Sequence, residues 1–143
     1  MADASLLADI IISKYRYHLP FYWVIEAYKE LRVTISHSTI NDWFKAVVGK
    51  LKPLYGLLRT QVLSCDYVQV DESTLPVIYN EKHRDDDAAQ RAAVVYSLLA
   101  TCKAHGVDER TWLEDVLRRM PEYELDKKDF SELLPGKWSP AAR

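Results

Sequence analysis

The stretch Ser64-Cys-Asp-Tyr-Val-Gln-Val-Asp-Glu-Ser-Thr-Leu-Pro-Val-Ile-Tyr-Asn80 is the part of the chain that reads clearly as β-strand. The Tyr and Val residues of 67–70 favour a strand, and Pro76 bounds a run that continues as Val77-Ile78-Tyr79. Elsewhere the apolar residues recur at helical spacing. We therefore predict a mainly α (α+β) fold, with two helical pieces around a short β-hairpin-like element at residues 64–83.

The acidic pair Asp71-Glu72 closes the first predicted strand. A carboxylate at the end of a buried strand is held rigidly at a sheet edge, where it can bind a divalent cation. Asp71 is therefore the candidate catalytic and metal-binding residue. The alternative is a polar hairpin turn over residues 71–73, in which the Asp71 side chain bonds the backbone. The residues alone leave both interpretations open.

Three blocks of sequence carry a resemblance to a known family. The segment Val68-Gln-Val-Asp-Glu-Ser-Thr-Leu-Pro-Val-Ile78 resembles the region around the first catalytic Asp in transposases of the insertion sequence 66 family. Residues 10–63 resemble the region that precedes this Asp, and residues 91–138 resemble the family's C-terminal segment. The motifs are Lys14-Tyr-Arg-Tyr-His-Leu-Pro-Phe-Tyr22, Ile35-Ser-His-Ser-Thr-Ile-Asn-Asp-Trp43, Gly106-Val-Asp108 and Trp112-Leu-Glu-Asp-Val-Leu117.

The resemblance implies a DDE-type transposase, in which three carboxylates on a ribonuclease-H-like sheet hold two divalent ions. Asp71 is the one catalytic carboxylate that carries over, and Mg²⁺ is the implied cofactor. Between Arg84 and Ala89 the family would carry the rest of its catalytic domain, including the second Asp and the Glu. One carboxylate binds Mg²⁺ only weakly, because the ion gives up its water reluctantly. We therefore predict an internally truncated, catalytically defective transposase remnant that need not retain the ion.

The first 63 residues predict three helices. The first covers residues 4–15, and Pro20 suits the first turn of the second, over Phe21–Leu31. A third begins near Ser36 or Ser38, either of which can cap it, and continues to about residue 63. We expect a kink or a restart at Pro53. The second helix is predicted to have a broad apolar face made of Tyr22, Trp23, Ile25, Ala27, Tyr28 and Leu31.

Helix, short turn and helix form the layout of a helix-turn-helix, whose second helix lies in the DNA major groove. The residues exposed near its N-terminus would be His37, Ser38, Asn41 and Lys45. Asn can bond adenine twice, and Lys45 can contact phosphate or guanine. Residues 1–65 carry a net charge of +3 and the remainder −5, which favours DNA contact in the first half. The alternative is a helical hairpin that packs on a catalytic sheet and never touches DNA.

The second half predicts a charged linker followed by a helical hairpin. Residues 84–90 read as exposed linker, because consecutive acids on a loop do not preset a coordination geometry for a cation. A helix over residues 88–105 stops at Gly106, and Asp108 caps the next helix. Pro121 is expected to end that helix, and a short turn follows at 130–134. Trp138 is predicted to fold back as an apolar anchor of the C-terminal segment 91–143.

Composition limits the class of protein. The chain of 143 residues is 48% hydrophobic and 28% charged, as globular proteins are, and its formal charge of −2 argues against indiscriminate coating of nucleic acid. The two cysteines, Cys65 and Cys102, form no Cys-x-x-Cys pair, which excludes a metal ribbon. No apolar run approaches the ~20 residues of a membrane span, and the N-terminus lacks a signal peptide. We expect a cytoplasmic protein.

Three functions remain open. The first is a transposase-family protein that has lost catalysis but keeps weak or moderate DNA binding through residues 21–50. The second is a metal-dependent DNA nuclease or strand-transferase, assembled in trans or with residues 85–87 as substitute ligands. The third is a helical interaction module that binds a second copy of itself or a full-length transposase. None of the three involves a membrane.

Overall fold

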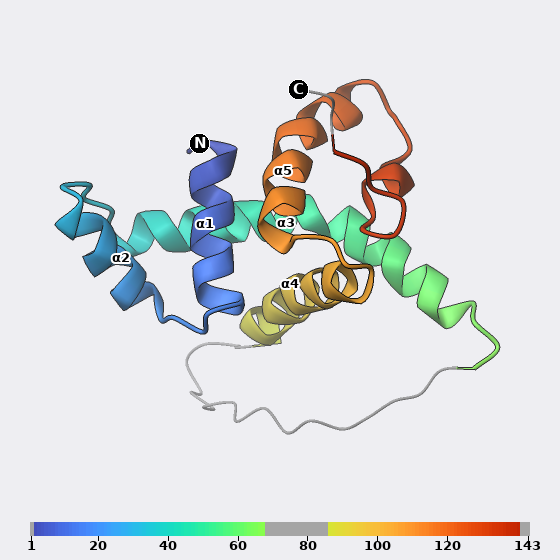
Figure 1. The fold of residues 1–143 in the computed structure, drawn as a ribbon, viewed down its shortest axis with the longest axis horizontal. Coiled ribbons are helices and arrows are strands. Elements are labelled where there is room, and N and C mark those ends of the chain that lie inside the picture. The colour runs from blue at the N-terminus through green and yellow to red at the C-terminus, as the bar shows by residue number, and fades with distance from the viewer. Residues whose placement is uncertain (1, 68–85, 141–143) are drawn as a thin grey trace.

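The computed structural model describes residues 2–67 and 86–140, and within these ranges the chain is helical (Figure 1). The predicted mainly α fold is confirmed, and no strand occurs in the described residues. The predicted β-hairpin-like element at 64–83 falls almost entirely outside them, and the described residues do not support the predicted ribonuclease-H-like remnant. The elements are α1 (Ala4–Tyr15), α2 (Phe21–Glu30), α3 (His37–Leu63), α4 (Asp86–Ala104), α5 (Glu109–Leu125) and a 3₁₀ turn, η1 (Phe130–Leu133).

The long helix α3 is the element on which the others pack. Its 27 residues span ~40 Å at the usual helical rise. Helices α1, α2, α4 and α5 and the η1 turn all contact it, and Figure 1 shows it crossing the molecule behind α1 and α5. One face of α3 supplies the buried row Ile40, Phe44, Val47, Val48, Leu51 and Leu54. The opposite face is left to solvent.

The core consists of one large cluster and one small cluster of buried side chains. The large cluster joins α1, α3, α4, α5 and η1, so the N-terminal and C-terminal helical regions share it. Trp112 lies fully buried at its centre and donates its indole N–H to the Leu133 carbonyl at 2.9 Å. The small cluster fixes α2 against α1 and the start of α3. Its members are Ile10, Val24, Ile25, Ile35 and Ile40.

Local capping chemistry sets the helix ends largely as predicted. The Ser36 hydroxyl accepts a hydrogen bond from the Thr39 amide at 3.1 Å and caps α3. Asp108 caps α5 through the Thr111 amide at 2.9 Å. Gly106 has a φ of 67° and follows the end of α4. The Val107 amide then bonds the Cys102 carbonyl at 2.9 Å, which closes a Schellman turn.

Two prolines do not end their helices. Of the kink or restart predicted at Pro53, the restart does not occur, because α3 continues through Pro53 to Leu63, and the kink stays a prediction. The predicted stop at Pro121 is wrong, because α5 continues to Leu125. A proline inside a helix costs ~3 kcal/mol. Tertiary packing outweighs that cost in α5, since Met120 is fully buried and Tyr123 nearly so. In α3 the buried leucines at 51 and 54 have the same effect.

The broad apolar face predicted for α2 is also wrong. Only Val24 and Ile25 of this helix are buried, and the main contacts of α2 are with α1 and α3. Tyr22, Trp23 and Leu31 are 54%, 61% and 72% exposed. The prediction for Trp138 is confirmed: it packs on the core and donates its indole N–H to Asp115 at 2.7 Å. Of the helices that the structure describes, none is both long and apolar enough to cross a membrane.

Candidate nucleic-acid interface

The turn between α2 and α3 holds the two helices in a fixed relation. Arg32 adopts a φ of 63° after the end of α2, and the Val33 amide bonds the Tyr28 carbonyl at 2.9 Å. On the other side of the turn, Ile35 precedes the cap of α3 and packs with Ile40, four residues into the helix, as a hydrophobic staple. The start of α3 is therefore fixed from both directions.

The four predicted DNA-contacting residues all lie exposed on the first turns of α3. His37, Asn41 and Lys45 follow one another at four-residue spacing, so they form a single row along the helix. The Asn41 amide nitrogen donates to the His37 carbonyl at 2.9 Å, which orients its side chain along this row. The Ser38 hydroxyl lies 2.8 Å from that of the capping Ser36. The Lys45 ammonium is 3.9 Å from Asp42, too far for a hydrogen bond.

The same face of α3 continues as a basic stripe, which we define as Lys45, Lys52 and Arg59. These residues are exposed and separated by seven positions, close to two helical turns, so they line up over ~21 Å. Gly49 and Gly56 lie between them, and no heavy atom lies within 4 Å of where a Cβ would stand at either. The stripe was missed in the sequence, although the seven-residue spacing was a readable signal for it.

Three exposed rings adjoin the start of α3. Trp23 and Tyr22 meet edge-to-face with centroids 5.6 Å apart. Tyr22 in turn stacks on His37, with centroids 6.4 Å apart and planes inclined by 16°. We call these three residues the aromatic surface. It joins the first turn of α2 to the row that begins at His37.

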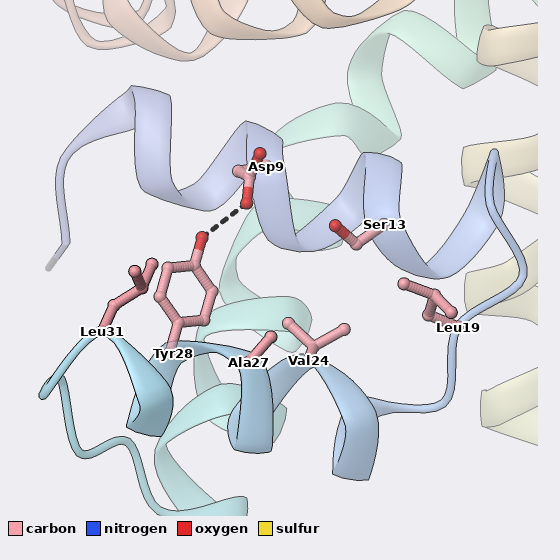
Figure 2. A pocket seen from close by; sticks show the side chains of 7 residues that line it. All are labelled: Asp9, Ser13, Leu19, Val24, Ala27, Tyr28 and Leu31. Carbon is pink, nitrogen blue, oxygen red and sulfur yellow. Dashed lines mark hydrogen bonds between the residues drawn. The ribbon is translucent and has the colours of Figure 1, made fainter.

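A groove of about 140 Å³ lies between α1 and α2, and Figure 2 shows its lining. The walls are mostly apolar, with Leu19 towards one end and Leu31 towards the other. The Tyr28 hydroxyl donates to Asp9 at 2.5 Å, and Arg110 pairs with the same carboxylate at 2.9 Å. Burial, followed by the bond to Asp9, raises the pKa of Tyr28 well above its usual range. The hydroxyl of Tyr28 and the carboxylate of Asp9 are therefore engaged with each other and with Arg110.

The structure does not test the predicted catalytic and metal-binding role of Asp71, which lies outside the described residues. Among the side chains that the structure describes, in residues 2–67 and 88–140, no three His, Cys, Asp or Glu are grouped so that they could hold a metal ion. The described residues therefore do not fit the Mg²⁺ pair of a DDE enzyme by themselves. Burial raises the pKa of the Cys102 thiol to about 12, so this cysteine is no nucleophile near neutral pH.

These features define a small helical protein with a helix-turn-helix-like pair and a solvent-facing basic helix. Comparison with protein families gives a more specific assignment. The model described as "Transposase IS66 family" matches residues 1–105, and that described as "IS66 C-terminal element" matches residues 97–135. The chain belongs to the IS66 transposase family, which confirms the resemblance seen in the sequence. The two matches overlap within α4.

Two relatives come from Sinorhizobium fredii. The chain is 32% identical to "Uncharacterized protein y4jD" over 114 residues, which cover 78% of this chain and 20% of the relative. It is 37% identical to "Uncharacterized protein y4hP" over 54 residues, which cover 38% of this chain and 9% of the relative. The chain therefore spans about a fifth of y4jD and less of y4hP. No solved structure matches it.

Proposed function

We propose that this chain is a DNA-binding remnant of an IS66 transposase that acts in the cytoplasm and binds duplex DNA through α2, the turn and α3. The proposal rests on the basic stripe. The stripe lies on the solvent face of α3 and begins at Lys45, the last residue of the row that starts at His37. Arg and Lys side chains in such an arrangement neutralise phosphates. Asn41, already oriented along the row, meets a base edge at the entry of the helix into the major groove.

The proposal assigns binding rather than strand transfer to this chain. Transposition by this family implies three converging carboxylates and divalent ions. Of these, the sequence offers Asp71, with Mg²⁺ as the ion it would help to hold. We propose that an internal truncation between residues 84 and 89 removed the other two carboxylates together with most of the ribonuclease-H-like sheet. A second copy of the chain or a full-length transposase would then be its protein partner on DNA.

The test compares duplex binding by the wild type with that of Lys45→Gln/Lys52→Gln/Arg59→Gln. Fluorescence anisotropy is measured over a series of salt concentrations. Each lost phosphate contact lowers the magnitude of the slope of log affinity against log salt by ~0.9. The slope of the triple variant should therefore be smaller in magnitude by roughly two to three times this amount, for every duplex sequence.

A matched control removes three positive charges elsewhere, in Lys103→Gln/Lys127→Gln/Lys137→Gln, at exposed positions of α4 and of the region after α5. This variant should keep both the affinity and the salt slope of the wild type. Equal losses in the two triple variants would show that only net charge matters, and the proposed interface would be wrong. Asn41→Ala should relax preference among duplex sequences and leave the salt slope unchanged.

A further inference from the structure

We propose that the aromatic surface of Trp23, Tyr22 and His37 binds unpaired DNA bases by stacking. The DNA that this chain recognises would then be a junction, where a duplex on α3 continues into a single strand on α2. This inference rests on the proposed DNA binding by α3 and names the class of DNA that the same site takes.

The first argument is the exposure of the rings. Tyr22 and Trp23 are 54% and 61% exposed, although α2 has two apolar neighbours against which they could have been buried. They meet each other and His37 instead of the core. Exposed aromatic faces supported by neighbouring rings are the platforms on which proteins stack unpaired bases. In a duplex the bases already stack on one another, so the platform needs unpaired ones.

The second argument is continuity with the duplex-binding row. Tyr22 stacks on His37 within 6.4 Å, and the His37 carbonyl accepts the Asn41 amide at 2.9 Å. Lys45 follows one turn further along α3. The row from His37 through Asn41 to Lys45 thus connects the aromatic surface with the basic stripe, and one strand can leave the duplex along this row and cross the rings.

The charge near the start of α2 favours nucleic acid over a protein partner. The Lys14 ammonium lies 4.3 Å from the centroid of Phe21, the residue next to Tyr22, so a cation flanks the start of α2. The nearest acid along α2 is Glu26, and Lys29 pairs with it at 3.5 Å. The positive charge of Lys14 at the start of α2 and the pairing of Glu26 therefore suit a DNA strand, whose backbone is negatively charged.

The experiment measures anisotropy with three labelled DNAs at one salt concentration: a blunt duplex, the same duplex with a short unpaired tail, and a duplex whose tail is abasic. For the wild type, the tail of normal bases should tighten binding by about tenfold. The abasic tail should add far less, because it supplies phosphates but no rings to stack. Quenching of tryptophan fluorescence by the tail should fall in Trp23→Phe.

The decisive variant is Tyr22→Ala/Trp23→Ala, which should keep the affinity for blunt duplex and lose the gain from the tail. Tyr22→Phe/Trp23→Phe should retain most of that gain, since the rings remain. The matched control is Tyr17→Ala, which removes an equally exposed aromatic ring (61%) that belongs to no part of the aromatic surface. It should leave all three affinities unchanged.

The outcomes separate this inference from the proposed function. If no DNA is bound by the wild type, the proposed function itself fails. If blunt duplex is bound but the tail adds nothing, or the abasic tail works equally well, stacking is overturned and duplex binding stands. If Tyr22→Ala/Trp23→Ala converts a dimer into a monomer in sedimentation and leaves the gain from the tail intact, the aromatic surface is a protein interface, and this inference is wrong.

Discussion

At the scale of single residues, Asp108 ties the end of one helix to the start of another. Its carboxylate accepts hydrogen bonds from both the amide and the hydroxyl of Thr111, at 2.9 and 2.8 Å. It also lies 3.5 Å from the Arg16 guanidinium, which follows α1 and bonds Glu109 at 2.6 Å. The hydrogen bond from the Thr111 amide is the largest cause that holds the pKa of Asp108 below its usual value. One acid therefore caps α5 and helps to dock α1 on it.

We predict that Asp108→Ala lowers the free energy of unfolding by about 1 kcal/mol, because the cap of α5 is lost. Asp108→Asn should lose less, since an amide oxygen still accepts from Thr111. The folded pKa is lowered, so the stabilisation by the charge is present above the ordinary pKa of 3.8 and disappears as pH falls through the folded value. Urea unfolding at several pH values measures both effects.

The control for the cap is Glu124→Ala, which removes an exposed acid of α5 that caps nothing, and it should stay close to the wild type. The gap between wild type and Asp108→Asn should narrow as pH falls below about 4. A gap that stays constant over this range would show that the charge of Asp108 contributes nothing to stability.

At the scale of the element, α3 combines two properties that oppose each other. It is the scaffold for four other helices, yet it carries two glycines and a proline, all of which weaken a helix. Both glycines lie on the solvent face, so packing on the buried face compensates for them. No atom outside the backbone of α3 lies within 4 Å of where a Cβ would stand at either glycine. Neither glycine is therefore needed to leave space for a neighbouring group.

We predict that Gly49→Ala and Gly56→Ala each raise the free energy of unfolding by about 1 kcal/mol, because alanine has the higher helix propensity and meets no obstacle. The opposite sign is expected for Gly106→Ala, because its φ of 67° is strained for any residue with a Cβ. Denaturant titration of the three variants measures these changes. A loss of stability in Gly49→Ala would mean that α3 is distorted at that position.

At this scale, features that adjacent residues set could be predicted from the sequence, and features that tertiary packing sets could not. The caps at Ser36 and Asp108 and the stop at Gly106 were predictable, because each is set by a few adjacent residues. The continuation of helices through Pro53 and Pro121 was not, since buried side chains on both sides of each proline decide it. The exposure of Tyr22 and Trp23 also depends on how few elements pack on α2.

The candidate site also combines features that could be predicted from residue spacing with features that depend on tertiary packing. That the four residues from His37 to Lys45 would be exposed on a helix followed from their spacing, and their contact with DNA stays a prediction. The extension of the row by Lys52 and Arg59 could have been read from the seven-residue spacing. The stacking of Tyr22 on His37 could not, because it depends on the geometry of the turn between two helices.

At the scale of the whole molecule, the N-terminal helices α1 and α3 and the C-terminal elements α4, α5 and η1 form one folding unit. The large core takes residues from α1 and α3 on one side and from α4, α5 and η1 on the other. This shared core holds the described N-terminal and C-terminal helices together in one helical body.

With Asp71 as its one catalytic carboxylate, the chain is not expected to respond to Mg²⁺. We expect no Mg²⁺-dependent nicking of plasmid DNA and no heat of Mg²⁺ binding in calorimetry, in the wild type and in Asp71→Ala alike. The physical reason is that a lone carboxylate does not displace water from Mg²⁺, and the two carboxylates that would share the ion were not found in the sequence. DNA binding by α3 should persist in EDTA. Nicking that requires Mg²⁺ and disappears in Asp71→Ala would instead mean that carboxylates from a second copy complete the site, and the chain would be a metal-dependent nuclease or strand-transferase.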